Sequence, residues 1–218
     1  MKLSAVTPTT LGLSLVLFGS VPALAARDKG DLVQLRVSVF NSSPISSSTI
    51  QQAEGEAGHV FRDVGVKVVW LNCPQDGQRE AAIGICSEAS FPSHLHLHIL
   101  RASQGLNAST VGISFLGQDG RGYHADLFYE PIRQLQEETH ASPSVILGHA
   151  MAHELGHLLL GANSHSPSGL MRAHWTGEDL TSASKGNLRF SPEQSLRIRN
   201  RIGSGEPGDA EITVTAQS

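Results

Sequence analysis

Short segments of alternating hydrophobic and polar residues recur along the first two thirds of the chain. Residues 32–40 alternate in this way, which predicts a half-buried strand because successive side chains of a strand point to opposite faces. Similar short runs predict four more strands, at 66–71, 94–100, 110–116 and 123–129. A helix is expected over 47–64, where Gly65 ends it.

A longer apolar segment follows these strands. Ser142 and Pro143 are suited to the N-cap and the first helical position, and Gly161 is suited to the helix end. The residues between them include Val145, Ile146, Ala150, Met151, Leu155, Leu158 and Leu159, so a mostly buried helix is expected. A last helix opens at Ser191, with apolar positions at Leu196, Ile198 and Ile202.

Two histidines and a glutamate lie within the apolar helix. His153 and His157 are four residues apart, so they share one helix face and can bind one ion, with Glu154 beside them. Burying imidazoles and a carboxylate among aliphatic side chains is costly unless they are paired or metal-bound. A catalytic zinc keeps three protein ligands and a water whose pKa it lowers to about 7, while a nearby carboxylate accepts a proton. The pattern predicts a catalytic zinc site with Glu154 as general base.

The residues after this helix offer a third ligand. Gly161 can adopt the left-handed conformation that reverses the chain, which would return His165 to the metal, and Met171 follows six residues later. Helix and turn resemble the metzincins, closest to the matrixin-like peptidases, where HExxHxxGxxH precedes a methionine-containing turn beneath the metal. The resemblance implies that zinc binds His153, His157 and His165, with Met171 as a structural residue under the metal.

Two intervals differ from the family pattern. Gly161 comes four residues after His157, and His165 comes four residues after Gly161. In the family pattern each of these intervals is three residues. One extra helical residue rotates the exit direction by about 100°, which an extra turn residue can compensate. The alternative third ligand is acidic and lies downstream, as in the gluzincins, with Glu178 or Asp179 as candidates. Ala173 stands where some metzincins have a tyrosine, so no tyrosine ligand is expected.

The resemblance also implies a fold and an activity. The order of elements is that of a metzincin-like zincin domain of the α+β class. Its twisted, mostly parallel sheet would pack on an N-terminal helix and the zinc-binding helix, followed by a Met-turn and a C-terminal helix. The implied activity is that of a zinc metalloendopeptidase acting on peptides or proteins. A non-catalytic exported zinc-binding or interaction domain and a zinc amidase acting on cell-wall peptides remain alternatives, but a pure metal-binding scaffold has no need of Glu154.

The N-terminal residues have the features of a secretory signal. Lys2 precedes an apolar core at 11–18 and an Ala-Leu-Ala cleavage motif that ends at Ala25. We therefore expect a signal peptide at 1–25, a catalytic domain at 26–202 and a flexible tail at 203–218. The apolar core is too short for a membrane span, so a secreted or periplasmic chain is expected.

Charge and cysteine content change this picture little. The formal net charge is −4, and it becomes about −5 without the signal, since Lys2 is the only charged residue lost. No nucleic-acid partner is indicated, and a monomer is expected. Cys73 and Cys86 would form a disulfide in an oxidising compartment, stabilising the fold by about 3 kcal/mol, with free thiols as the alternative.

Other histidines leave open questions. His94, His96 and His98 alternate and would project from one strand face, where they either bind a second metal or form a polar face opposite leucines. Two roles are open to His124, which are to line the cleft or to bind a structural ion. His149, one helical turn before His153, is expected to be structural, and His174 and Trp175 are placed where they can shape a substrate pocket.

Overall fold

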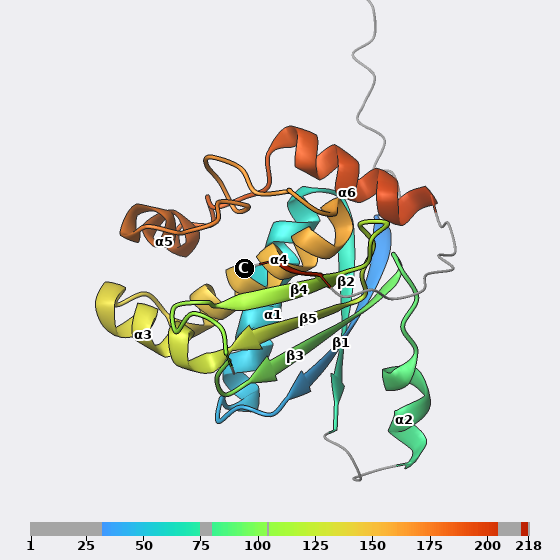
Figure 1. Cartoon of the computed structure of the whole chain (residues 1–218), viewed down its shortest axis with the longest axis horizontal. Coiled ribbons are helices and arrows are strands. Elements are labelled where there is room, and N and C mark those ends of the chain that lie inside the picture. Colours follow the sequence, from blue (N-terminus) through green and yellow to red (C-terminus); the bar gives the residue numbers. More distant parts are fainter. Residues whose placement is uncertain (1–31, 75–79, 104, 205–214, 218) are drawn as a thin grey trace, which may run out of the picture. The chain divides into compact units, whose positions relative to one another are not determined.

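The computed structural model describes residues 32–74, 80–103, 105–204 and 215–217, which contain a six-stranded sheet (Figure 1). The strand order is β2-β1-β3-β5-β4-β6. β1, β2, β3 and β5 are parallel, while β4 is antiparallel to both β5 and β6. The bounds are β1 Val33–Asn41, β2 Val66–Cys73, β3 His94–Leu100, β4 Gly112–Leu116, β5 His124–Phe128 and β6 Thr215–Gln217. The expected α+β class and mostly parallel sheet are confirmed.

The two longest helices pack side by side against this sheet (Figure 1). They are α1 (Ser47–Asp63) and α4 (Pro143–Leu160), and α4 contacts β4 and β5. The shorter helices are α2 (Glu80–Ser87), α3 (Tyr129–Thr139), α5 (Gly177–Ser184) and α6 (Pro192–Ser204). Because α3, α5 and α6 also contact α4, this helix is covered along nearly its whole length.

The alternation of residues along the strands determines which sheet face meets the helices. On β1, Leu35, Val37 and Val39 are buried in the core with the side chains of α1 and α4. Leu95, Leu97 and Ile99 on β3 are buried in the same core. Successive strand residues point to opposite faces, so the three β3 histidines lie on the other face of the sheet.

The sequence-based elements agree with the structure at all five expected strands and three expected helices, with ends that differ by at most two residues where both ends were stated. Helices α2, α3 and α5 were not anticipated. Thr215–Gln217, within the expected tail, form β6, and α6 extends to Ser204. The expected signal peptide at 1–25 and tail residues 205–214 and 218 lie outside the described residues.

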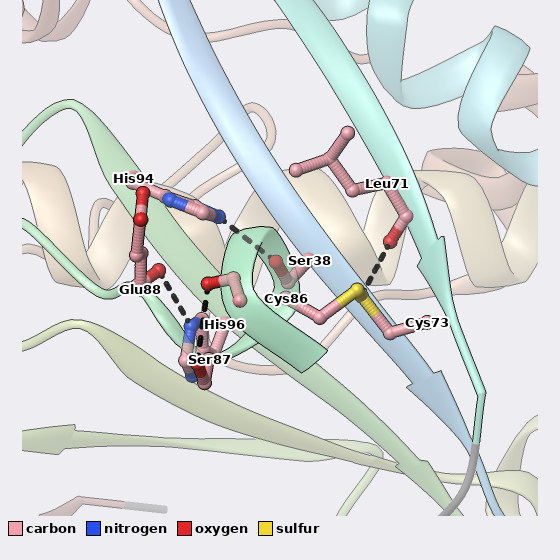
Figure 2. The surroundings of a disulfide bond; sticks show 9 residues. Ser38, Leu71, Cys73, Cys86, Ser87, Glu88, His94 and His96 are labelled. Atoms are coloured by element: carbon pink, nitrogen blue, oxygen red, sulfur yellow. Dashed lines mark hydrogen bonds between the residues drawn. A yellow bond between two sulfur atoms is a disulfide. The ribbon is translucent and has the colours of Figure 1, made fainter. Parts of the chain in front are cut away.

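The expected disulfide between Cys73 and Cys86 is present (Figure 2). Its two Cα atoms are 5.9 Å apart, and it ties the last residue of β2 to α2. Part of the loop that it closes, residues 75–79, lies outside the described residues. None of the helices in the described part of the chain is both long and apolar enough to cross a bilayer.

Candidate metal centre

Helix α4 carries the first two histidines of the candidate centre. Pro143 occupies its first turn, where a missing N–H costs nothing, and Gly161 follows its last residue. The helix approaches α1 so closely at Gly148 that a Cβ there would lie 2.5 Å from the carbonyl oxygen of Ala53. His153 and His157 are 8% and 7% exposed.

A reversal after α4 brings His165 to the same place. Gly161 has φ 85° and ψ −171°, a conformation open mainly to glycine, although it is not the left-handed helical one expected from the sequence. Asn163 also has a positive φ, 57°. These two residues lie within the lengthened part of the motif, and the ring of His165 comes to 4.5 Å from that of His157, measured between centroids.

The three imidazoles converge through their Nε2 atoms. Nε2 of His157 lies 3.0 Å from Nε2 of His153 and 3.0 Å from Nε2 of His165. His153 donates its Nδ1–H to the carbonyl oxygen of Leu170 at 2.8 Å, so its Nε2 carries a lone pair when the ring is neutral. Burial lowers the pKa of His153 to about 4 and, together with the adjacent imidazoles, the pKa of His157 to about 3. The two buried rings are therefore neutral at pH 7.

Hydrogen atoms alone cannot satisfy both short contacts. Nε2 of His153 carries no proton, so a hydrogen bond between His153 and His157 needs a proton on Nε2 of His157. Once protonated, Nε2 of His157 can no longer accept a hydrogen bond from Nε2 of His165. A cation removes this conflict by accepting all three lone pairs. Zinc–nitrogen bonds of about 2.0–2.1 Å in a tetrahedron separate nitrogens by about 3.3 Å, near the observed spacing. The residues present therefore fit a zinc ion.

Two polar groups on the turn hold the imidazoles in position. Nδ1 of His157 is hydrogen-bonded to Oγ of Ser164 at 2.8 Å. The carbonyl oxygen of Leu170 accepts from His153 and also from Nε1 of Trp175, at 3.1 Å. Metal-binding histidines typically use their second nitrogen in this way, which fixes ring orientation. Ser164 and Leu170 were not identified from the sequence, because their roles depend on where the turn lies.

The carboxylate of Glu154 lies against β4, next to Ser114 and Gly112. The Ser114 hydroxyl donates to Oε2 of Glu154 at 2.7 Å, and a Cβ at Gly112 would lie 2.6 Å from Oε1. Burial raises the pKa of Glu154 to about 8, and the charge of Asp126 acts in the same direction. A cation at the histidines would oppose this shift. The roles of Ser114 and Gly112 were also not predicted, because the sequence of β4 does not indicate that this strand packs against α4.

Met171 lies beneath the helix at Gly156. It is fully buried, and a Cβ on Gly156 would lie 2.7 Å from Sδ of Met171 and 2.8 Å from Cε1 of Phe190. The absence of a side chain at position 156 therefore allows the methionine to approach α4 at a residue that lies between His153 and His157 in the sequence. This packing is compatible with the structural role expected for Met171.

An open pocket of about 380 Å³ leads to the three histidines and Glu154. Its wall includes apolar surface from Val111, Leu135, Ala150 and Trp175, together with His174. The Trp175 ring stands edge-on to His153 with centroids 5.6 Å apart. A solvent-open cavity with both apolar walls and convergent polar groups can admit a substrate.

The alternative acidic ligand does not lie with the histidines. Oδ2 of Asp179 accepts hydrogen bonds from Thr176 and Arg172 at the start of α5, and Glu178 is exposed. Among the described residues, the group that contains His153 and His157 is completed by His165. His149 donates from Nδ1 to the carbonyl oxygen of Val145, within its own helix.

Comparisons with known proteins return structural likenesses only. No protein-family model matches the chain, and no curated protein matches it. A zinc-dependent peptidase from Methanocorpusculum labreanum aligns with a TM-score of 0.46 at 14% identity, over 74% of this chain and 99% of its own. Archaemetzincin from Methanopyrus kandleri aligns with a TM-score of 0.46 at 16% identity, over 82% and 99%. Metalloproteinase-II from Bacteroides fragilis has a TM-score of 0.45 at 15% identity, over 77% of this chain and 52% of its own. Activity must therefore be inferred from the side chains of this chain.

Proposed function

We propose that this chain is an exported zinc-dependent endopeptidase. The observation that carries the proposal is the convergence of three imidazole Nε2 atoms beside the buried carboxylate of Glu154, at the end of an open pocket. His153, His157 and His165 would hold the ion. The disulfide between Cys73 and Cys86 is compatible with an oxidising compartment, which supports export.

The histidines and the glutamate would divide the chemistry between them. A zinc ion with three histidine ligands acidifies a bound water and polarises a substrate carbonyl. Glu154 would accept the proton from the attacking water and then deliver it to the leaving amine. The Ser114 hydroxyl orients one carboxylate oxygen, Oε2, and the absence of a side chain at Gly112 leaves room for Oε1 beside β4.

The pocket walls would position the peptide. Leu135, Ala150 and Trp175 offer apolar surface beside the histidines, so an apolar residue next to the scissile bond is favoured. Trp175 is also tied to the centre through Leu170, whose carbonyl oxygen accepts from both Trp175 and His153. A substrate side chain against Trp175 would therefore lie close to a metal ligand.

The decisive experiment compares cleavage by the wild-type chain and its Glu154→Gln variant. Both proteins, without the signal and loaded with zinc, are incubated with a diverse peptide library and with cell-wall peptides, and products are read by mass spectrometry. Glutamine keeps the size and can still accept from Ser114, so zinc content should be unchanged. Removing the base should lower turnover by about 10²–10⁴-fold.

Each outcome distinguishes one interpretation from another. Cuts inside library peptides that depend on Glu154 support an endopeptidase and give its preference around the scissile bond. Cleavage confined to cell-wall peptides would replace the proposal with a cell-wall amidase. Equal turnover by both proteins would remove Glu154 from the mechanism, and a zinc-loaded wild type without any cleavage would favour a non-catalytic zinc-binding domain.

A further inference from the structure

A second polar cluster lies on the sheet face opposite the helices. It comprises His98 on β3 and His124 and Asp126 on β5, each partly buried. One ligand atom from each residue lies within 4.8 Å of the other two. His98 is the direct register partner of Asp126, and His124 and Asp126 are two residues apart, so all three side chains project from the same face.

Two of the three histidines of β3, His94 and His96, have hydrogen-bond partners outside the cluster (Figure 2). Nε2 of His94 is hydrogen-bonded to Oγ of Ser38 at 2.8 Å, and Nε2 of His96 donates to the carbonyl oxygen of Glu88 at 3.0 Å. Only His98 joins the cluster with β5. A metal held by His94, His96 and His98 together, one option from the sequence, is therefore not supported.

The cluster has the donors and the surroundings of a metal site. Nε2 of His124 lies 2.8 Å from Oδ1 of Asp126, and the ring centroids of His98 and His124 are 4.4 Å apart. The side chains of His124 and Asp126 are 27% and 16% exposed. Aromatic rings flank them, with Phe40 4.7 Å from His98 and Phe115 5.1 Å from His124, between centroids. Two imidazoles and one carboxylate form a donor set that zinc binds well.

We propose that His98, His124 and Asp126 bind a second zinc ion, which links β3 to β5. The carboxylate supplies negative charge, and small rotations of the three side chains would bring their ligand atoms to bonding distance. This site is separate from the first centre, because it lies on the other face of the sheet. Its effect would be structural: Ala125, between His124 and Asp126, is the register partner of Ser114, the residue that holds Glu154.

The experiment counts zinc ions in the full chain and in single variants. Proteins are dialysed against buffered zinc, and bound metal is measured by inductively coupled plasma mass spectrometry. The wild type should hold two equivalents, and Asp126→Asn and His98→Gln should each hold one. His96→Gln is the matched control, because it removes an imidazole from the same face of β3 but should still hold two.

His157→Gln should lose zinc from the first centre and keep one equivalent at the second. This variant therefore distinguishes an error in the first proposed site from an error in the second. A wild type with a single equivalent that His157→Gln abolishes would overturn the proposal, as would two equivalents in Asp126→Asn. Near-ultraviolet circular dichroism checks that each variant is folded. Anomalous scattering at the zinc edge from wild-type crystals tests the site without any substitution: a peak between His98, His124 and Asp126 supports it, and its absence contradicts it.

Discussion

In the proposed zinc centre, single residues fix the directions in which two of the three imidazoles point. His153 and His157 use their Nδ1 atoms on Leu170 and Ser164, which leaves both Nε2 atoms directed at one point. His165 is the exposed member of the group, and its Nε2 completes the set at 3.0 Å from that of His157. Replacing a metal ligand should therefore weaken zinc binding more than replacing a residue that only orients a ligand.

Replacing His165 with alanine should weaken zinc binding strongly, because only two protein ligands would remain. We expect a greater loss of affinity than any supporting residue gives, measured by competition with a chromophoric zinc chelator. Asp179→Asn is the matched control for the alternative acidic ligand and should bind zinc as the wild type does. If His165→Ala bound zinc normally, another residue would have to be the third ligand.

The Ser164→Ala variant should bind zinc about 10–100-fold more weakly, because Nδ1 of His157 loses its partner and the ring loses its fixed orientation. The same chelator competition measures the effect. Ser166→Ala is a suitable control, since the Ser166 hydroxyl donates to the carbonyl oxygen of Ser168 and not to a histidine. Equal affinities in the two variants would show that Ser164 does not support the ligand.

At the scale of elements, α4 could be predicted well and α3 could not. The long apolar run of α4 exceeds the length of a strand, and Ser142-Pro143 and Gly161 mark its ends. In α3, Pro131 interrupts the pattern, although proline is tolerated in the first turn of a helix. The packing of Met171 against Gly156 could not be predicted, because the sequence around either residue does not indicate that the two come into contact.

Gly156→Ala tests this packing between α4 and the following turn. The new Cβ would lie 2.7 Å from Sδ of Met171 and 2.8 Å from Phe190, so overpacking should destabilise the zinc-free protein by about 1–3 kcal/mol despite alanine's better helix propensity. Urea unfolding measures the free energy. Gly55→Ala in α1, where nothing lies within 4 Å of the new Cβ, should instead stabilise by about 0.5–1 kcal/mol. A stabilised Gly156→Ala would contradict the packing described.

For the molecule as a whole, a buried carboxyl that is not part of the candidate metal centre links stability to pH. Glu54 in α1 is 6% exposed, and its Oε1 has no hydrogen-bond partner among the described residues. Burial raises its pKa above the ordinary value of 4.5, partly offset by a hydrogen bond that Asn72 donates. The folded chain therefore holds this proton to higher pH than the unfolded chain does.

The sign of the effect follows from this difference in bound protons. Stability due to Glu54 is greatest below pH 4.5 and falls as pH rises through its folded-state pKa. Glu54→Gln should therefore become progressively more stable than the wild type as pH increases from 4.5 toward neutrality. Urea unfolding of both proteins across this range measures the change, and a difference independent of pH would show that Glu54 does not titrate as expected.

The order of residues is enough to predict the helix that carries His153, Glu154 and His157, the alternation that directs the aliphatic side chains of β1 and β3 to one face, and the pairing of the two cysteines. These features depend on helix and strand periods, which neighbours along the chain set. Other features are visible only in the folded chain. His165 rather than Asp179 joins the histidines, Ser114 and Ser164 hydrogen-bond to the site residues, and His98 lies with His124 and Asp126 rather than with the other β3 histidines. These contacts join residues that are distant in sequence, or distinguish between histidines that look alike in the sequence of one strand. They therefore form only when the strands and turns have come together.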